Sequence, residues 1–421
     1  MVVVYVVLEQ GIIYSQNNKP STANHLSELA VPSSTFALLK RFAFLPQSDA
    51  ILSFGIQRGK EIIKLKNYVG LLSLFDGTII EILPKTTHNT LPDARIALLK
   101  LLRVSENLPF QHLTPAFLQQ SPLPLWEVFV GAFLGEMEKI TMRGIQRVYT
   151  SKQDIQPFVR GKWLVSKQQP LEPHWVSVVY DDFEADNLPN RLLKTCLVYL
   201  AKRSQYLPHQ RRLHYLLCVW EEISISTHLT ADFEQLPLND RRFDYYQKAL
   251  AWAKVLLKGQ SWGSRGQWLN ESLLFPAERL FEHYVIQGFK RYFADFEIKV
   301  QDQSQFLIER HENQRRFSLR PDLVLKRHHQ LWVFDMKWKC LDPQLPNYGI
   351  SQGDLYQLYA YGKKYNATAL FLIYPAHATF QAPLPPFLYD KQMTLHVLPF
   401  EINNPWSVEI EKIRSYLGSI F

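Results

Sequence analysis

The chain has 421 residues, which is enough for two or three domains that each bury a core of their own. Apolar residues make up 47% of the chain and aromatic residues 13%, so the composition excludes an intrinsically disordered protein. A formal net charge of +8 is compatible with a polyanionic partner but does not require one.

The first residues and the cysteines together favour a protein of the reducing cytoplasm. The apolar run at residues 1–8 is followed at once by Glu9, and it is too short for a signal-peptide core or a membrane span. We expect a β-strand there and no membrane association. Cys196, Cys218 and Cys340 stand far apart, and their spacing indicates neither a disulfide framework nor a zinc site.

Residues 1–92 are expected to form a β-rich domain. Strand-like runs occur at residues 2–8, 51–54, 62–65, 68–74 and 78–83, with glycines and an Asp76-Gly77 turn signal between them. The segment from Gly55 to Lys60 resembles a phosphate-binding loop, but it is one residue short and Glu61 replaces the serine or threonine that would bind Mg²⁺. We therefore expect no nucleotide-hydrolysing loop in this chain.

Residues 93–265 are expected to form a mostly helical middle domain that positions other parts of the protein. Residues 125–143 give the clearest helix, because their apolar side chains fall on one face and Gly144 is a natural stop. Further helices are predicted at residues 93–104, 190–203, 211–223 and 240–258. The glycine- and serine-rich run at residues 259–266 marks the expected boundary of the last domain.

Residues 266–421 are expected to form an α/β domain with a mixed sheet, so the predicted fold class is α+β with several domains. The predicted elements are a helix at 276–289, strands at 297–300 and 306–309, a hairpin at 323–337, a helix at 353–365 and a buried strand at 369–374. Glu282 borders the apolar stripe of the first helix. It is either a metal or water partner for the sheet behind it or part of a solvated helix edge.

The hairpin is the segment around which the rest of the chain is organised. Strands at residues 323–326 and 331–337 flank a polar turn at residues 327–330. If the turn loops out, Lys326 faces Leu331, and counting along the antiparallel ladder brings Asp322 opposite Asp335. Opposed residues share one face of a sheet, with Cβ atoms about 5 Å apart.

The side chains at this end of the hairpin have the chemistry of a metal site. Strand alternation places Asp335, Lys337 and Lys339 on one face. Two carboxylates as close as this pair repel each other unless a cation lies between them, and hard oxygen ligands suit Mg²⁺. Lys337 would hold a water beside the metal or neutralise charge that builds up on a phosphate.

Pro321-Asp322 and Asp335-Met-Lys337 together resemble the catalytic signature of the PD-(D/E)xK nuclease superfamily. The alternative is a surface ion pair, which is the commoner setting for an Asp-x-Lys on a strand. The apolar run at residues 331–334 favours the nuclease interpretation, because it places the acid and the lysine at the end of a buried strand.

Segments along most of the chain resemble the McrC family, the nuclease subunit of the McrBC modification-dependent restriction system. In order, they are Lys66-Asn-Tyr-Val-Gly70 with residues 80–85, residues 126–144 with Val159-Arg-Gly-Lys162, residues 180–194, the two hairpin motifs, and Ser351-Gln-Gly-Asp-Leu-Tyr-Gln357. Agreement over this length is much more specific than the acid-and-lysine pattern alone. Trp338 departs from the family, which commonly has a tyrosine after the lysine.

This resemblance implies a Mg²⁺-dependent DNA endonuclease that works with a McrB-like AAA+ GTPase hexamer on double-stranded DNA carrying modified cytosine. In that family the N-terminal β region docks into the central channel of the ring and stimulates hydrolysis of GTP, which the partner binds. Asp322 and Asp335 would be the metal ligands and Lys337 the catalytic lysine. Gln357 and Tyr361 match the Q-x-x-x-Y element of related nucleases and would touch a DNA phosphate or orient the lysine.

Glu282 completes the predicted catalytic set. Candidate DNA contacts are Arg310, Arg315, Arg316 and Arg320, just before the hairpin, together with Lys339. For each arginine the alternative is a solvated loop. Two other functions remain open, namely a regulatory or scaffold subunit of the AAA+ motor that does not cleave, and a stand-alone DNA repair nuclease.

Overall fold

The computed structural model describes residues 3–16, 26–46, 48–74, 76–85, 90–104, 109–112, 123–164, 175–237, 240–258, 272–390 and 393–420. The chain divides into two compact units. Residues 126–259 form the first unit, and residues 3–125 together with residues 260–421 form the second. The second unit is therefore built from both ends of the chain.

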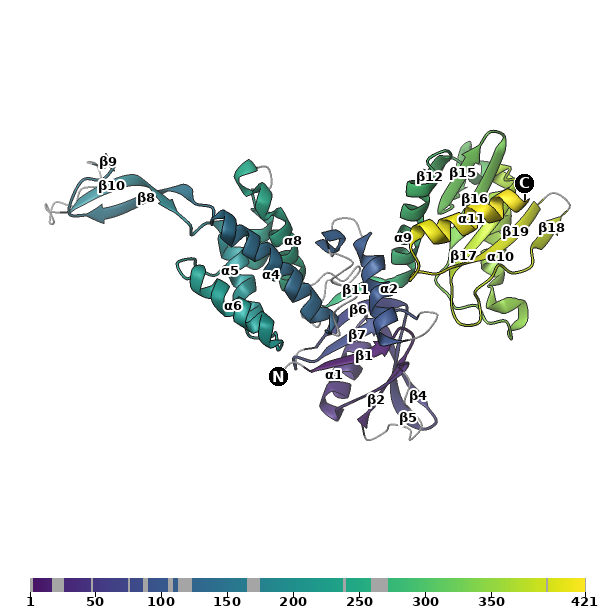
Figure 1. The fold of residues 1–421 in the computed structure, drawn as a ribbon, viewed down its shortest axis with the longest axis horizontal. Helices are drawn as coiled ribbons and strands as arrows, with labels where there is room; N and C mark the ends of the chain where they lie inside the picture. Colours follow the sequence, from purple (N-terminus) through teal and green to yellow (C-terminus); the bar gives the residue numbers. More distant parts are fainter. Residues whose placement is uncertain are drawn as a thin grey trace. The chain divides into compact units, whose positions relative to one another are not determined.

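The described N-terminal part of the second unit consists of small sheets flanked by helices (Figure 1). One sheet has the strand order β3-β2-β5-β4 and the other β1-β7-β6-β11. All of the predicted strands are present, and their aliphatic side chains form a shared core. The elements are β1 (Val4–Leu8), β2 (Ile12–Ser15), β3 (Glu28–Val31), α1 (Ser33–Ala43), β4 (Leu52–Gln57), β5 (Lys60–Leu65), β6 (Tyr68–Ser73), β7 (Ile79–Leu83), α2 (Leu91–Arg103) and β11 (Leu273–Pro276).

This division differs from the predicted domain boundary at residue 93. Helix α2, predicted as the start of the middle domain, belongs to the second unit, where the Lys100 ammonium donates to the carbonyls of Ile402 (3.1 Å) and Asn403 (2.6 Å). Strand β11, predicted to lie in the last domain, pairs with β6 of the N-terminal sheet instead. The boundary predicted at residues 259–266 lies outside the described residues.

Gly70 allows β11 to approach β6 closely. Its φ is 128°, and a Cβ atom added there would lie 1.9 Å from the carbonyl oxygen of Leu273. We expect Gly70→Ala to destabilise the protein by about 3 kcal/mol or more, because both the positive φ and the clash oppose the added methyl group. Denaturant unfolding measures the loss. Gly77→Ala is the control, since its φ is also positive (83°) but its Cβ would meet nothing within 4 Å. Equal losses in the two variants would contradict a role for close strand approach.

The first unit has a helical body. Its helices are α4 (Leu125–Arg143), α5 (Leu188–Ala201), α6 (Leu207–Val219), α7 (Leu229–Glu234), η4 (Arg241–Tyr246) and α8 (Gln247–Lys258), so the helices predicted in this region are confirmed with shifted ends. The buried Glu127 carboxylate accepts hydrogen bonds from Ser204 Oγ (2.7 Å) and Gln205 N (2.9 Å) and lies 2.8 Å from His209 Nδ1. These contacts tie the start of α4 to the segment that joins α5 and α6.

The first unit also contains a three-stranded sheet of order β8-β10-β9. Its strands are β8 (Val148–Gln156), β9 (Lys162–Trp163) and β10 (Val176–Glu184). The prediction of a mostly helical region missed this sheet. β8 is largely polar and exposed, and β10 has two adjacent buried residues followed by an acidic, partly exposed end, so neither strand has a clear apolar alternation. Tyr149 and Phe183 pair on it with ring centroids 4.8 Å apart, although they are 72% and 50% exposed.

A six-stranded sheet of order β12-β15-β16-β17-β19-β18 forms the C-terminal part of the second unit (Figure 1). β15 and β16 are antiparallel, whereas β16, β17 and β19 are mutually parallel, so the predicted mixed sheet is confirmed. The elements are α9 (Ala277–Tyr292), β12 (Glu297–Val300), β15 (Leu323–Arg327), β16 (Gln330–Met336), α10 (Gln352–Tyr365), β17 (Ala369–Pro375), β18 (Phe387–Asp390), β19 (Met393–Phe400) and α11 (Trp406–Ile420).

Helices cover both faces of this sheet. Phe334 of β16 packs against Phe289 of α9, with ring centroids 5.1 Å apart. Val333, the preceding residue, belongs to the core that includes Leu358 and Tyr361 of α10. Because side chains alternate along a strand, the odd-numbered residues at the end of β16 face α10.

None of the described helices combines the length and the apolar composition that crossing a lipid bilayer requires. Cys196, Cys218 and Cys340 all lie in the described part of the chain, and none of the three forms a disulfide bond.

Candidate active site

The hairpin of β15 and β16 has the predicted register. Lys326 lies opposite Leu331, as expected. The flanking residues 327 and 330 also pair, so the turn consists of His328 and His329, with His328 at a φ of 53°. The predicted four-residue turn is therefore too long, because a two-residue turn with a positive φ closes the hairpin. The error leaves the register unchanged.

Asp322, Asp335 and Lys337 converge at the end of these strands. Asp322 lies one position before β15, and its Oδ2 accepts a hydrogen bond from the Met336 N–H at 2.7 Å. Asp335 is 2% exposed. Its Oδ2 lies 2.8 Å from the Lys337 ammonium. The three residues predicted to form the centre of the site are thus brought together.

Gln357 and Tyr361 connect the Lys337 ammonium to the backbone that precedes Asp322. Lys337 Nζ donates to Gln357 Oε1 (3.3 Å), and Gln357 Nε2 donates to the Tyr361 hydroxyl (2.9 Å). The Tyr361 hydroxyl in turn donates to the Arg320 carbonyl (3.1 Å). Burial raises the pKa of Tyr361 to about 12, so the hydroxyl stays neutral and keeps its proton for this bond. The relay joins the lysine at the end of β16 to the segment that carries Asp322.

Burial and like charges oppose ionisation of the acidic pair. Burial first, and then the charges of Asp335 and Glu282, raise the pKa of Asp322 to about 8. Burial also raises the pKa of Asp335, although the charge of Lys337 opposes the shift. Burial alone would lower the pKa of Lys337, but Asp335 and Asp354 outweigh it and the lysine stays charged. Carboxylates outnumber ammonium groups here, which favours binding of a further cation.

The buried carboxylate of Asp335 and the half-buried carboxylate of Asp322 are a donor set that fits Mg²⁺. This ion prefers oxygen ligands, keeps several of its waters and is often bound through one or two protein carboxylates. Within the described residues, no group of three or more His, Cys, Asp or Glu side chains is arranged to hold a metal ion. A site here would use Asp322 and Asp335, with water in the remaining positions.

A cavity of about 420 Å³ opens beside Asp322. Gln301 holds its walls together, because its Nε2 donates to Glu282 Oε1 at 2.6 Å and its Oε1 accepts a hydrogen bond from the Arg320 guanidinium. Glu282 is therefore part of a cavity wall rather than a solvated helix edge, and the exposed Arg320 lines the same cavity as Asp322. The lining residues are Arg279, Glu282, His283, Gln301, Arg320 and Asp322.

The predicted DNA contacts fall into separate groups. Arg310, Arg315 and Arg316 are exposed on the two-stranded sheet of β13 (Phe306–His311) and β14 (Gln314–Ser318), which is not part of the six-stranded sheet. Their polar partners lie on the same hairpin. Arg320 lies at the cavity instead. Lys339 pairs at 3.1 Å with a carboxylate in the first turn of α10.

Sequence reasoning missed Gln301 and Asp354. Gln301 follows β12 at a φ of 47° in a polar run that carries no motif, so no signal could have identified it. Asp354 lies 3.9 Å from the Lys337 ammonium and 3.1 Å from that of Lys339. Its signal was present, because it lies three residues before Gln357 on a predicted helix and therefore on the same face.

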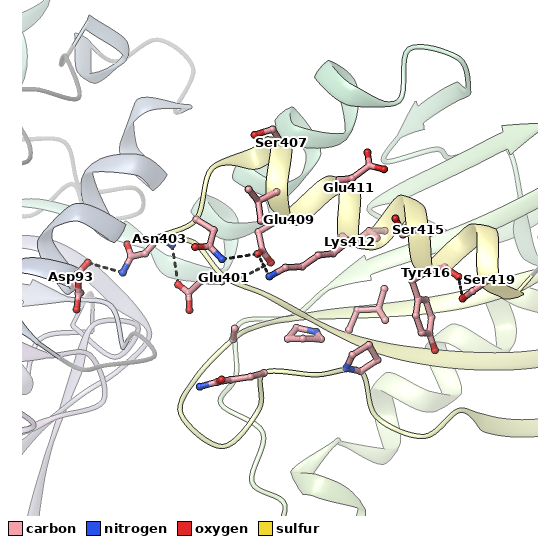
Figure 2. A pocket seen from close by; sticks show the side chains of 18 residues that line it. Asp93, Glu401, Asn403, Ser407, Glu409, Glu411, Lys412, Ser415, Tyr416 and Ser419 are labelled. Carbon is pink, nitrogen blue, oxygen red and sulfur yellow. Dashed lines mark hydrogen bonds and ion pairs between the residues drawn. The ribbon is translucent and has the colours of Figure 1, made fainter.

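A larger cavity of about 1230 Å³ lies along α11 (Figure 2). The Glu409 carboxylate in its wall accepts hydrogen bonds from the Glu401 N–H (3.0 Å), Asn404 Nδ2 (2.8 Å) and Lys412 Nζ (2.6 Å). This network fixes the chain at the start of α11. The hairpin acids and lysine do not line this cavity, so we assign the candidate active site to the hairpin.

Fold and site together define an α+β protein of several sheets with an acidic pair, half-buried Asp322 and buried Asp335, beside a lysine. A family model described as "McrBC 5-methylcytosine restriction system component" matches residues 63–375, which is most of the chain. The chain therefore belongs to the McrBC family of restriction system components.

Two solved structures are similar to this chain. One is a refined half-complex from the tetradecameric assembly of Thermococcus gammatolerans McrB AAA+ hexamers with bound McrC. The match to it is 17% identical, has a TM-score of 0.72 and covers 98% of this chain and 100% of that chain. The other is the Thermococcus gammatolerans McrBC complex. The match to it is 20% identical, has a TM-score of 0.51 and covers 70% of this chain and 89% of that chain. At these identities the likeness shows the fold alone. No curated protein matches the chain.

Proposed function

We propose that this chain is the nuclease subunit of a McrBC-type restriction complex and cleaves DNA as a Mg²⁺-dependent PD-(D/E)xK endonuclease. The observation that carries the proposal is the Lys337 ammonium 2.8 Å from the buried Asp335, with Asp322 fixed beside it by the Met336 N–H. A buried acid and a half-buried acid beside a charged lysine are costly for a purely structural site, and such groups cluster where chemistry is done.

The residues of the chain have distinct roles in this proposal. Asp322 and Asp335 hold Mg²⁺, which when bound supplies Lewis-acid activation of water and stabilises charge on the phosphate. Lys337 places its positive charge where negative charge develops during phosphodiester hydrolysis. Gln357 and Tyr361 orient Lys337 through the relay described above, since their polar atoms are already engaged with the lysine and the backbone.

DNA contact is proposed at two places. Arg320 and Glu282 border the cavity beside Asp322, where the arginine is placed to meet the scissile phosphate or its neighbour. Arg310, Arg315 and Arg316 project from their exposed hairpin and serve as phosphate contacts that set the register of the DNA without reading its sequence. Lys339 and Lys337 both lie close to the Asp354 carboxylate, so their ammonium groups are on the same side of the site.

We further propose a McrB-like AAA+ GTPase hexamer as the partner, because the similar Thermococcus structure contains McrC bound to such hexamers. The family resemblance makes the β-rich domain predicted at residues 1–92 one candidate for docking into the ring. The sheet of β8, β9 and β10 is a second candidate, since the exposed rings of Tyr149 and Phe183 are typical of a protein contact surface. A variant with both Tyr149→Ala and Phe183→Ala distinguishes these candidates in the cleavage assay of the complex.

The proposed function is tested by purifying the chain with a McrB-like AAA+ GTPase and measuring cleavage of methylated and unmethylated DNA. We expect cleavage that requires both proteins, GTP and Mg²⁺, and that is selective for methylated DNA. Stimulated GTP hydrolysis without cleavage would identify a regulatory or scaffold subunit. Cleavage by the chain alone, without GTP, would identify a stand-alone repair nuclease.

A further inference from the structure

The main chain that carries Lys337 leaves the sheet at this residue. β16 ends at Met336, and the Lys337 N–H donates to the Ile373 carbonyl at 2.9 Å. Residues 338–342 have no strand structure. Sheet pairing therefore does not hold the residue that follows Lys337, and other contacts must fix it.

Trp338 is held by a residue from the far end of the sequence. Its indole N–H donates to Glu9 Oε2 at 2.6 Å, and the two residues are 329 positions apart. Its ring packs against Phe281 of α9, with centroids 5.3 Å apart. Glu9 directly follows β1, and its other oxygen accepts a hydrogen bond from the Lys85 N–H at 3.2 Å. The N-terminal sheet is thus bonded to the residue next to Lys337.

Glu9 is a carboxylate in a place where a neutral side chain would be cheaper. It is 2% exposed, and among the described residues no side-chain cation forms an ion pair with it. Burial raises the pKa of Glu9 to about 7, even though the Trp338 and Lys85 hydrogen bonds act in the opposite direction. Lys85 and Cys340 are the titratable groups whose charges face it. A buried charge that opposes folding points to a role other than stability.

We propose that Glu9 is a positioning residue for the candidate active site: its carboxylate clamps the Trp338 indole and thereby fixes the main chain that carries Lys337. The proposal rests on the nuclease function proposed above and deepens it, because it makes the N-terminal sheet part of the apparatus that aligns the lysine. It also gives a reason for tryptophan at the position after the lysine. The indole supplies an N–H that donates to the carboxylate, which a phenylalanine ring could not do.

Lys100 offers a matched control. Its ammonium donates to the carbonyls of Ile402 (3.1 Å), Asn403 (2.6 Å) and Asn404 (3.4 Å). It therefore joins the same two parts of the second unit as Glu9 does, but it bonds to the loop between β19 and α11 rather than to a neighbour of Lys337. Lys100→Met removes these bonds and leaves the Trp338 clamp intact.

The test compares Glu9→Gln, Trp338→Phe, the double variant and Lys100→Met in the full complex with the AAA+ partner. We expect Glu9→Gln at pH 8 to keep or raise the Tm, because a buried charge is removed, and yet to lower kcat for DNA cleavage by about 10–100-fold at unchanged KM. Trp338→Phe should lower kcat similarly, and the double variant should lose no more than either single one. GTP hydrolysis and the rise in Tm on adding Mg²⁺ should match wild type. Lys100→Met should lower the Tm and leave kcat unchanged.

Wild-type kcat for Glu9→Gln, in a complex whose wild type cleaves, would overturn the positioning role and leave the nuclease function standing. If kcat and Tm fall together, and to the same extent in Glu9→Gln and Lys100→Met, the positioning role would also be overturned, because the role of Glu9 would then be structural. A wild-type complex that does not cleave would overturn the nuclease function and this inference with it.

Discussion

Asp335→Asn is expected to lower DNA cleavage by the complex about 10³-fold or more. The same substitution should make the isolated chain more stable. The loss follows because the site keeps one carboxylate of the two that would bind Mg²⁺. The gain follows because burial disfavours the charged form of Asp335 and a neutral amide of nearly the same shape does not carry that penalty. The gain should appear as a higher Tm at pH 8 without Mg²⁺.

The pH dependence of stability checks the same electrostatics. The pKa of Asp322 in the folded chain, about 8, lies above its ordinary value of 3.8, so the folded state binds this proton more tightly than the unfolded state. The resulting stabilisation is complete at low pH and is lost as the pH rises through about 8. Without Mg²⁺ the Tm of the wild type should therefore fall between pH 5 and pH 8, and Asp322→Asn should flatten the profile.

Added Mg²⁺ should raise the Tm of the wild type at pH 8 and should not raise that of Asp335→Asn, because a bound ion stabilises the folded state by mass action. Asp390→Asn is the control. Asp390 forms an exposed pair with Lys363 at 2.8 Å, so its replacement should change the Tm, the Mg²⁺ response and cleavage very little. A Tm for Asp335→Asn below that of the wild type at pH 8 would contradict the electrostatic account.

Lys337→Met is expected to abolish cleavage to a similar extent but with the opposite effect on stability. Removing the ammonium 2.8 Å from Asp335 leaves the acidic pair without its closest positive charge, so the Tm without Mg²⁺ should fall. Both carboxylates remain, so Mg²⁺ should raise the Tm of this variant by more than it raises that of the wild type. Comparing Asp335→Asn with Lys337→Met thus separates the binding of Mg²⁺ from the effect of the lysine charge on the phosphate.

Tyr361→Phe should give an intermediate loss, about 10-fold in kcat, because it removes the hydroxyl that connects Gln357 to the Arg320 carbonyl and leaves the ring in place. Tyr365→Phe is the control on the same helix, since its hydroxyl donates to the Asp302 carbonyl at 3.0 Å and does not contact the relay. If both variants lose kcat equally, helix α10 rather than the relay positions the lysine.

The centre of the site was predictable because it is local in sequence. An antiparallel hairpin fixes its own register, so Lys326 opposite Leu331 was enough to bring Asp322 and Asp335 to the same end of the two strands. Helix periodicity placed Gln357 and Tyr361 on one helix face, and a motif resemblance gave them two possible roles, contact with a DNA phosphate or orientation of Lys337; the relay itself was not predicted. The roles assigned to these residues stay predictions until cleavage is measured.

The features that sequence reasoning missed depend on long-range contacts or on strands without an apolar pattern. Glu9 and Trp338 are 329 positions apart, and neither belongs to a periodic pattern that points to the other. β8 exposes five of its nine side chains and β10 buries two adjacent residues, so alternation gave no clear signal. Arg316 and Arg320 are four residues apart, but the end of β14 between them places one on an exposed hairpin and the other at the cavity.

The pairing of β11 with β6 has a consequence for synthesis of the protein. The Ser73 N–H donates to Ser272 Oγ across 199 positions, so the ribosome must release most of the polypeptide before the β6 edge finds its neighbour. Until then that edge presents unsatisfied amides to other nascent chains, which is a known route to aggregation. Fragments that stop before residue 272 should therefore form inclusion bodies on expression. In a chain whose residues 126–259 are replaced by a short flexible linker, β11 reaches β6 early in synthesis, so this chain should remain in the supernatant.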